Sequence, residues 1–385
     1  MLLIIIYVAF ISLGLPDSLL GSAWPVIQAQ LQAQTSWAGI LTMIAASGTI
    51  ISSLLSDRLT KRFGTGLVTA VSVLMTAAGL YGYSRATSFI HLCLLNIPLG
   101  LGAGAVVAAL NNYVALHYKA RHMSWLHCFW GVGASLSPYL MAWSLSQPMG
   151  WQGGYRTVFY IQAALTVVLF LSLSLWQARS ASGGQQDRQG EPLKLSAALS
   201  IRGVPLMLLT FFGYCALEAT AGLWASSYLV QFRAIDEETA ARYASLFFIG
   251  ITAGRFLCGF VAEKIGDKWL IRGGILGMAL GVLMVMLPLP GDQLALSGLV
   301  VIGLGGAPIY PAIIHATPSN FGKENSQAII GIQMASAYLG ATLMPPLFGI
   351  IAQYISIGLY PYYMMLFAVL MILMSERLNK ELKIA

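Results

Sequence analysis

The chain has 385 residues, of which 57% are hydrophobic and 9% are charged, whereas soluble domains carry about 25% charged residues. So few polar groups cannot cover a soluble globule of this size, and the composition therefore excludes an ordinary soluble fold. The net charge of +7 does not indicate a nucleic-acid partner, because Lys and Arg occupy short connections between apolar runs and form no basic patch with interleaved aromatics.

Apolar segments recur along the whole chain, and each is long enough to be a membrane-spanning helix. A polar stretch rich in Gly, Ser and Gln separates the sixth from the seventh and indicates a linker, 178–200. The sequence therefore predicts an all-α membrane protein with twelve transmembrane helices in two six-helix bundles, 1–177 and 201–385. In chain order the segments are 2–29, 36–56, 64–84, 88–117, 123–146, 154–177, 203–231, 240–262, 269–288, 293–318, 325–354 and 356–376.

Lys and Arg are divided unevenly between the two sets of connections. The side that contains the loop between the second and third segments has far more of them than the opposite side, where the basic residues are Arg85, Arg156, Arg233 and Arg242. Because cytoplasmic loops carry the excess of positive charge, we expect both termini and the linker to be cytoplasmic. The chain is expected to be a multi-pass protein of a bacterial inner (plasma) membrane.

The two halves repeat short motifs at offsets of 203 to 207 residues. GASLSP at 133–138 is followed by GATLMP at 340–345, and GLGAG at 100–104 by GLGGA at 303–307. Three matches at a common offset, including the charged loops, indicate a duplicated six-helix unit. Parallel repeats with a solute site near the bilayer midplane are a transporter architecture.

Two of these repeated stretches resemble a known family. SSLLSDRLTKRFG (52–64) and GRFLCGFVAEKIGDK (254–268) are similar to the cytoplasmic signatures of the major facilitator superfamily. GLPDSLLGSAWP (14–25), WLHCFWGVGASLSP (125–138) and GLGGAPIYPAI (303–313) resemble the fucose–proton symporter branch, which includes hexose permeases. The resemblance implies alternating access with proton-driven uptake of a sugar.

Two acids inside apolar segments are the predicted proton-coupling residues. An ionised side chain near the bilayer centre costs about 2.5–3.5 kcal/mol, and Asp17 lies in the first segment and Glu218 in the seventh, its partner after duplication. In the resembling branch the fourth helix often carries an acid, where this chain has Val107. The alternatives are a cap on a helix broken at Pro16 for Asp17 and a structural hydrogen bond for Glu218. Coupling to Na⁺ stays open, and no cofactor is expected.

Aromatic and amide side chains within the segments are the predicted solute-binding residues, because sugars require hydrogen-bond donors, acceptors and stacking surfaces. Asp17, Gly21, Trp24 and Gln28 share one helical face. A packing role between helices is the alternative for each residue. The predicted set is Trp24, Gln28, Asn111, Asn112, Gln162, Trp224, Tyr228, Tyr310, Gln333 and Tyr338.

Charged residues near the cytoplasmic side are expected to latch helix ends in one state of the transport cycle. They are Asp57, Arg58, Arg62 and Arg255. A pure topology signal is the alternative for the loop residues Asp57, Arg58 and Arg62. Arg255 is expected near the inner boundary, where a snorkelling side chain or an interhelical salt bridge would serve. His127 is a possible proton relay, or else a hydrogen-bonded histidine at a helix end.

The sequence contains no Walker lysine loop, no HExxH or GxSxG motif and no Cys/His cluster, so neither ATP-driven transport, an enzyme nor a metal site is expected. Proton-coupled uptake of a sugar is the favoured hypothesis. An exporter of drugs or metabolites, a membrane sensor and a membrane enzyme are the alternatives. The expected partners are a small-molecule solute and the lipid bilayer, with the chain a monomer.

Overall fold

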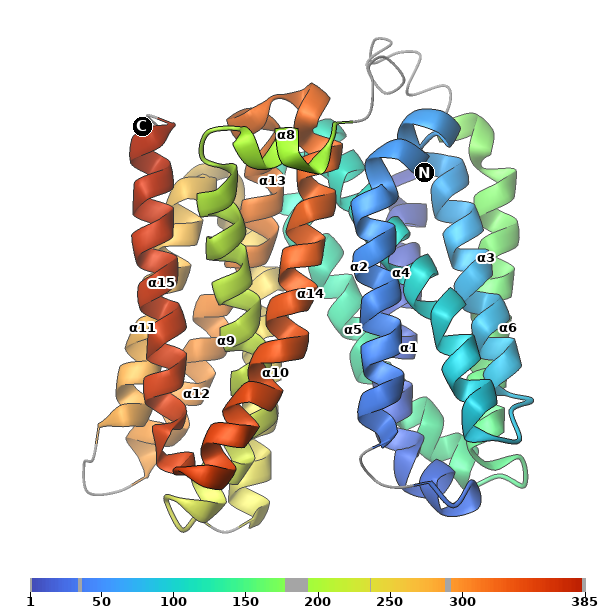
Figure 1. Cartoon of the computed structure of the whole chain (residues 1–385), viewed down its shortest axis with the longest axis horizontal. Helices are drawn as coiled ribbons and strands as arrows, with labels where there is room; N and C mark the ends of the chain where they lie inside the picture. Colours follow the sequence, from blue (N-terminus) through green and yellow to red (C-terminus); the bar gives the residue numbers. More distant parts are fainter. Residues whose placement is uncertain (1, 34–36, 177–192, 236, 288–291, 383–385) are drawn as a thin grey trace. The chain divides into compact units, whose positions relative to one another are not determined.

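The computed structural model describes residues 2–33, 37–176, 193–235, 237–287 and 292–382, and the described residues are helical apart from short connections (Figure 1). The predicted all-α class is confirmed, and each predicted segment overlaps a helix. The chain divides into two compact units. Unit 1 comprises residues 1–113 and 126–193, and unit 2 comprises residues 114–125 and 194–385.

Unit 1 is a helical bundle with a large apolar cluster among its described residues and a smaller one at Val68, Ala105 and Ala109. Leu19, Leu80, Tyr83 and Trp151 are among the buried side chains that form the large cluster, and helix α6 packs against both α1 and α3. Its helices are α1 (Leu2–Gln30), α2 (Trp37–Phe63), α3 (Thr65–Tyr83), most of α4 (Phe89–His117), most of α5 (Ala120–Leu145) and α6 (Gly150–Leu171).

Unit 2 is arranged around helix α9, which packs against α10, α13, α14 and α15. The short segment 114–125 belongs to this unit, where Lys119 pairs with Glu263 at 3.1 Å. Its other elements are α8 (Leu195–Ser200), α9 (Val204–Gln231), α10 (Glu237–Ile265), α11 (Asp267–Met286), α12 (Gln293–Gly306), α13 (Ile309–Phe321), α14 (Lys323–Tyr354), the 3-10 helix η1 (Ile357–Leu359) and α15 (Tyr360–Glu381).

Close helix crossings recur at equivalent places in the two units. In unit 1 a Cβ added at Gly100 of α4 would overlap the backbone of Ala45 on α2. In unit 2 a Cβ added at Gly303 of α12 would overlap the backbone of Phe247 on α10. Glycine at these positions lets the helix backbones touch, so the repeated sequence motifs correspond to repeated helix packing.

Two short turns repeat in the same way. Gly64, between α2 and α3, has φ 80° and ψ 153°, and Gly266, between α10 and α11, has φ 80° and ψ 154°. Glycine adopts positive φ without the steric penalty of a Cβ. The same backbone turn therefore connects the second and third helices of each repeat.

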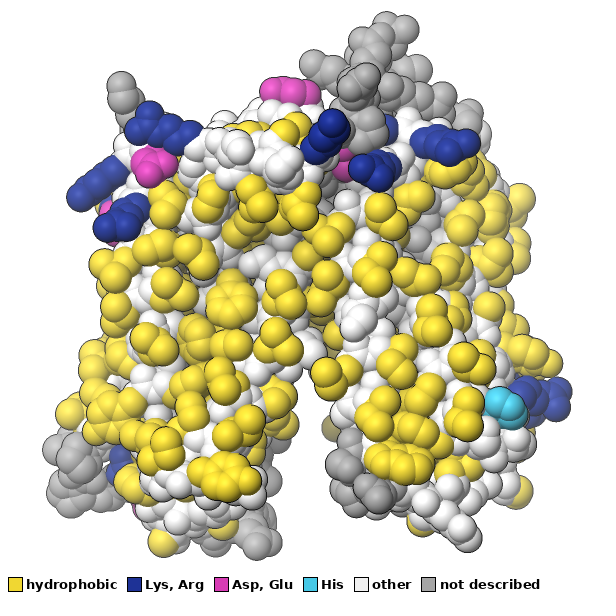
Figure 2. All heavy atoms as spheres, viewed as in Figure 1, with side chains coloured by type: hydrophobic (Ala, Val, Ile, Leu, Met, Phe, Trp, Pro, Cys, Tyr) yellow, Lys and Arg dark blue, Asp and Glu magenta, His cyan; other side chains and the backbone are white. Residues whose placement is uncertain are grey.

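The described part of the chain has eleven helical spans that are long and apolar enough to cross a membrane. Figure 2 shows hydrophobic side chains covering the visible face of each unit, with Lys and Arg gathered chiefly at one end. Large apolar side chains that are more than half exposed include Ile51, Leu94, Leu171 and Leu366, as expected of helices that face lipid. Helix α5 is not among the eleven spans.

Three details of the prediction change. The segment expected at 293–318 is two helices, α12 and α13, interrupted at Ala307 and Pro308, because proline has no backbone N–H to donate. Helix α1 continues through Pro16, so the alternative in which Asp17 caps a broken helix is wrong. In the expected linker, 178–192 lies outside the described residues and Leu195–Ser200 forms helix α8.

Candidate functional site

A polar pair joins α1 and α5 at a close crossing of these helices. A Cβ at Gly14 would overlap the backbone of Trp130, and one at Gly133 would overlap the backbone of Ile11. This approach brings the indole of Trp130 to Asp17, whose Oδ2 accepts a hydrogen bond from the indole N–H at 3.0 Å. Asp17 is solvent-exposed although it lies in a membrane span. The carboxylate of Asp17 is therefore not enclosed by the side chains of its own bundle.

A second polar pair lies one turn away along α5 and is closed to solvent. His127 Nε2 lies 3.0 Å from Asn111 Oδ1 on α4, and both side chains are buried. The ring of Phe10 packs edge-on against His127, with ring centroids 5.6 Å apart. Because His127 is buried in the bundle, it does not lie at an exposed helix end. Its relay role and the solute-binding role of Asn111 stay predictions.

The remaining residues of the predicted face on α1 have different environments. Gly21 is exposed beside Asp17, whereas Trp24 is 7% exposed and belongs to the large apolar cluster of unit 1. This burial favours packing over solute stacking for Trp24. Gln28 is half-buried, and its Oε1 has no hydrogen-bond partner among the described residues. This acceptor is itself buried, so a role of Gln28 in solute binding stays a prediction.

Glu218 occupies the position in unit 2 that Asp17 occupies in unit 1. The crossing of α1 and α5 at Ile11 corresponds to a crossing of α9 and α14, where a Cβ at Gly340 would lie 2.7 Å from the carbonyl oxygen of Phe212. Asp17 follows Ile11 by six residues, and Glu218 follows Phe212 by six. The two acids are thus in the same register on equivalent helices.

The partner of Glu218 is a buried arginine. Arg255 Nη2 on α10 lies 3.4 Å from Glu218 Oε1 and 3.3 Å from the hydroxyl of Tyr214. The Arg255 side chain is 5% exposed and that of Glu218 is 23% exposed. Glu218 lies at the middle of α9, so Arg255 lies inside the bundle and not at the inner boundary, where the sequence placed it.

Two tyrosine rings lie on one side of this ion pair. Tyr214 is buried, and the half-buried ring of Tyr310 meets it edge-on, with centroids 6.2 Å apart. The hydroxyl of Tyr310 donates to the sulfur of Met334 at 3.1 Å. An ion pair held among rings is poorly screened by water, which strengthens its attraction for other charges.

Two of the predicted amides are satisfied within the bundles. Gln162 is fully buried, accepts from Thr76 at 2.7 Å and donates to the carbonyl oxygen of Ser12 at 2.9 Å. Gln333 is fully buried and donates to Thr317 Oγ1 at 2.9 Å. These contacts favour a structural role, because neither amide faces a space that a solute could enter.

The other predicted aromatic and amide residues are partly or fully packed. Trp224 donates its indole N–H to the carbonyl oxygen of Pro345 at 2.9 Å. Tyr228 is 1% exposed and packs between Phe232 and Tyr360. Asn112 is buried, whereas Tyr338 is half-buried on α14. Tyr228 is therefore the least accessible of the predicted aromatic ligands.

The predicted latch residues divide by burial. Asp57 is buried, and its Oδ2 accepts from Lys61 at 3.2 Å and from the backbone N–H of Leu193 at 3.1 Å. Arg58 is exposed, and Arg62 is exposed with its guanidinium over the ring of Phe63. Asp57 thus holds the last described residue of unit 1, whereas the two arginines face outward.

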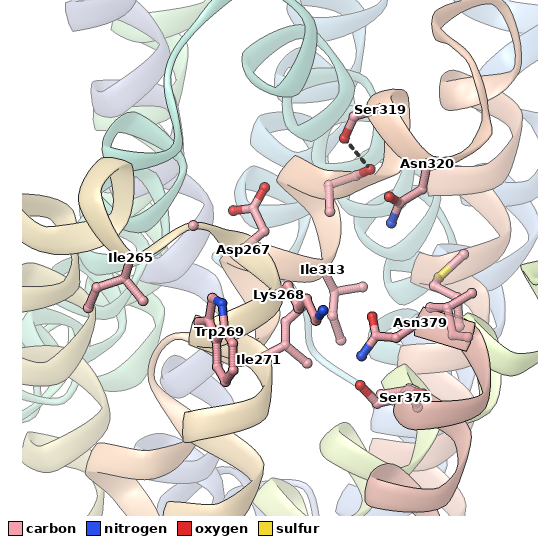
Figure 3. A pocket seen from close by; sticks show the side chains of 15 residues that line it. Ile265, Asp267, Lys268, Trp269, Ile271, Ile313, Ser319, Asn320, Ser375 and Asn379 are labelled. Carbon is pink, nitrogen blue, oxygen red and sulfur yellow. Dashed lines mark hydrogen bonds between the residues drawn. The ribbon is translucent and has the colours of Figure 1, made fainter. Parts of the chain in front are cut away.

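A separate cavity of about 340 Å³ lies at the ends of α11, α13 and α15 in unit 2. Figure 3 shows Asp267, Asn320, Ser375 and Asn379 around it. Asp267 Oδ2 also lies 2.7 Å from His315 Nδ1. Because its polar residues come from helix ends, we distinguish this cavity from the polar groups in the middle of the spans.

Trp130 as the partner of Asp17, and Glu218 as the partner of the predicted Arg255, are the site contacts that sequence reasoning missed. Trp130 lies 113 residues from Asp17, and Arg255 lies 37 residues from Glu218, so no local spacing links either pair. A signal for the second pair was present, because a lone arginine in an apolar segment needs a buried counter-charge. The duplication itself gives no such signal for Trp130.

Apolar helical spans, two repeats and intramembrane acids define the class of protein: a multi-pass membrane transporter. A family model described as Major Facilitator Superfamily matches residues 6–241 and 206–376. The chain belongs to this superfamily, whose members are transporters and not enzymes.

Known proteins with similar sequences transport different solutes. The chain is 27% identical to the cis,cis-muconate transport protein of Acinetobacter baylyi, over 86% of this chain and 83% of that protein. It is 22% identical to the glucose/mannose transporter GlcP of Bacillus subtilis, over 89% and 86%.

A solved structure shares the fold. The fucose:proton symporter FucP of E. coli superposes with a TM-score of 0.79 at 15% identity, over 98% of each chain. The predicted resemblance to the fucose and hexose symporter branch is confirmed at the level of the fold.

Proposed function

We propose that this chain is a secondary active transporter that takes up a sugar or a similar small polar solute together with protons. The observation that carries the proposal is the exposed Asp17 in a membrane span, hydrogen-bonded to Trp130. Protonation neutralises this carboxylate and removes most of the cost of enclosing it in a low-dielectric site. The carrier can then close over its solute and open the solute site to the other side of the membrane.

The proposed solute class follows from the chemistry of the polar and aromatic groups in each unit and from the relatives. Unit 1 offers the acceptors of exposed Asp17 and half-buried Gln28. Unit 2 offers the acceptor of Glu218 and the half-buried rings of Trp224, Tyr310 and Tyr338 for C–H faces. The names of a glucose/mannose transporter and a muconate transporter among the relatives support small polar solutes, neutral or carboxylated. Asn111 and Asn112 are buried in unit 1 and are proposed to support the solute-binding residues of that unit.

The proposed topology has twelve spans, with α5 as the twelfth, and both termini in the cytoplasm of a bacterial inner membrane. Helix α5 carries Arg121, His122 and His127, which lower its hydropathy. A helix that presents polar groups to a solute path, as α5 does with Trp130, is expected to be less apolar than one that faces only lipid.

Purified protein in liposomes tests the function directly. Labelled sugars and small organic acids are supplied outside, and an inward proton gradient is imposed at constant internal buffer. Wild type is expected to accumulate at least one solute, whereas Asp17→Asn is expected to lose accumulation but retain exchange of labelled for unlabelled solute. The proposal fails if accumulation is unchanged in Asp17→Asn. Gradient-driven loss of a preloaded solute would instead identify proton antiport and an exporter.

A further inference from the structure

We infer that the solute carries a carboxylate, which binds Arg255 in exchange for Glu218. The inference deepens the proposed transport function and rests on it only for the statement that the ligand is a transported solute. It is built on residues of unit 2 alone.

Arg255 is a buried cation with unused binding capacity. Its side chain is 5% exposed, and its Nε has no hydrogen-bond partner among the described residues. An unsatisfied buried donor costs about 1–3 kcal/mol, and more when the group is charged. A membrane protein that retains such a group gains nothing in stability from it, because an apolar residue would pack there without this cost.

The contact between Arg255 and Glu218 is weaker than this guanidinium can form. Charge-assisted N–H···O bonds are normally about 2.7–2.9 Å long, and arginine pairs with carboxylates through two parallel bonds. Arg255 reaches Glu218 with one nitrogen at 3.4 Å. Arg272 and Glu376 in the same unit form both bonds, at 2.7 Å and 2.6 Å. Arg121–Glu263 and Arg202–Glu381 also join through one nitrogen, but between side chains that are at least 35% exposed. The pair of Arg255 and Glu218 is therefore incomplete although its arginine is buried.

The exposed fractions of the two side chains indicate from which side a ligand would approach the pair. The side chain of Glu218 is 23% exposed, whereas that of Arg255 is 5% exposed. An incoming carboxylate meets Glu218 first and can occupy two guanidinium nitrogens only when Glu218 withdraws. The half-buried ring of Tyr310 borders this exchange. The geometry fits a small carboxylate and gives a neutral sugar no comparable advantage.

The exchange has a consequence for charge. Arg255 can be neutralised by one carboxylate at a time, so a bound solute carboxylate leaves Glu218 as an excess negative charge. Glu218 is then expected to take up a proton from the solvent to which it is exposed. The bound state would contain one solute anion and one added proton.

The experiment compares ligands that differ only in the carboxylate. Binding of D-glucuronate against D-glucose, and of adipate against hexane-1,6-diol, is measured on the full-length purified transporter by calorimetry. Wild type is expected to bind at least one carboxylate about tenfold or more tighter than its neutral counterpart, the factor that a hydrogen bond to a charged group provides. Equal affinities within both pairs would overturn the inference.

Three variants locate the preference. Glu218→Gln removes the competing carboxylate and is expected to tighten carboxylate binding about tenfold further, while Arg255→Gln is expected to abolish the preference. The double variant R255Q/E218Q leaves no lone buried charge, so it provides the same measurement if Arg255→Gln fails to fold. Arg272→Gln removes an arginine of the complete pair and is the matched control, in which the preference stays unchanged. A preference that persists without Arg255 overturns the inference.

The failures of the two proposals can be distinguished. Proton-driven accumulation of neutral sugars without any preference for a carboxylate would leave the transport function standing and remove the inference. Carboxylate binding that depends on Arg255, without accumulation of any solute in a proton gradient, would leave the binding inference standing and remove the proposed proton-coupled transport.

Discussion

Asp17 and Glu218 hold equivalent positions but have partners of different kinds. Trp130 donates a neutral N–H to Asp17 at 3.0 Å, whereas Arg255 offers Glu218 a full positive charge at 3.4 Å. A neutral donor stabilises an ionised acid less than a cation does. Asp17 is therefore the acid that we propose for proton coupling, whereas Glu218 is paired with a cation.

Trp130→Phe tests the importance of the hydrogen bond to Asp17. The ring is retained and the donor is lost, and a hydrogen bond to a charged group contributes about 1.5–3 kcal/mol. The pH at which uptake is half-maximal is expected to move upward by about one to two units. Uptake is measured in liposomes across a pH series. An unchanged profile would show that the indole N–H does not influence the exchange of protons.

Gln162→Leu tests whether a predicted binding residue is structural. The change leaves Thr76 and the carbonyl oxygen of Ser12 without the contacts that Gln162 provides, at a cost of about 1–3 kcal/mol. The melting temperature is expected to fall, while the affinity for the solute stays the same in the folded fraction. A large loss of affinity without loss of stability would restore Gln162 to the binding site.

At the scale of helices, glycines determine how closely the elements approach. Gly133 lets α5 touch α1, and Gly340 lets α14 touch α9. The sequence showed both glycines within a repeated motif, but it could not show which helices they meet. The close approach of α1 and α5 brings Trp130 to Asp17, so this contact depends on glycine, which has no side chain, at position 133.

Gly133→Ala is expected to destabilise unit 1, because the added methyl group overlaps the backbone of Ile11 and overpacking costs about 1–3 kcal/mol. Gly273→Ala on α11 is the matched control. Nothing lies within 4 Å of a Cβ at Gly273, and alanine favours a helix over glycine. Thermal unfolding followed by fluorescence compares the two. Equal melting temperatures would contradict the role assigned to the crossing.

The helices and the site were not equally predictable. Apolar runs of about 20 residues fix spans because the bilayer sets their length, and a polar residue within a run marks a functional position. The break between α12 and α13 was missed because GLGGAP at 303–308 is apolar throughout. Trp130 as the partner of Asp17, and Glu218 as the partner of the predicted Arg255, were not predicted. A contact between helices depends on their rotation and packing, which hydropathy does not record.

At the scale of the whole molecule, the proposed topology can be tested with single cysteines. Thr87, between α3 and α4, and Ser196, on α8, are both exposed, and the proposal places them on opposite sides of the membrane. Thr87→Cys is expected to react with an impermeant maleimide in intact cells, and Ser196→Cys only after permeabilisation. The native Cys93, Cys128, Cys215 and Cys258 are replaced beforehand. The reverse pattern would invert the topology.

Because one of the two acids is paired with an arginine and the other with a tryptophan, the transport cycle is expected to depend on the membrane potential. With both acids ionised, Asp17, Glu218 and Arg255 sum to −1, and a proton on Asp17 brings the sum to zero. One charge crossing a potential of 100 mV changes the free energy by about 2.3 kcal/mol. An inside-negative voltage should therefore hasten the outward return of the empty carrier and leave its proton-loaded form indifferent. In wild type, uptake measured at fixed potassium diffusion potentials is expected to become faster as the inside becomes more negative. In Asp17→Asn, the exchange of labelled for unlabelled solute is expected not to change with the potential.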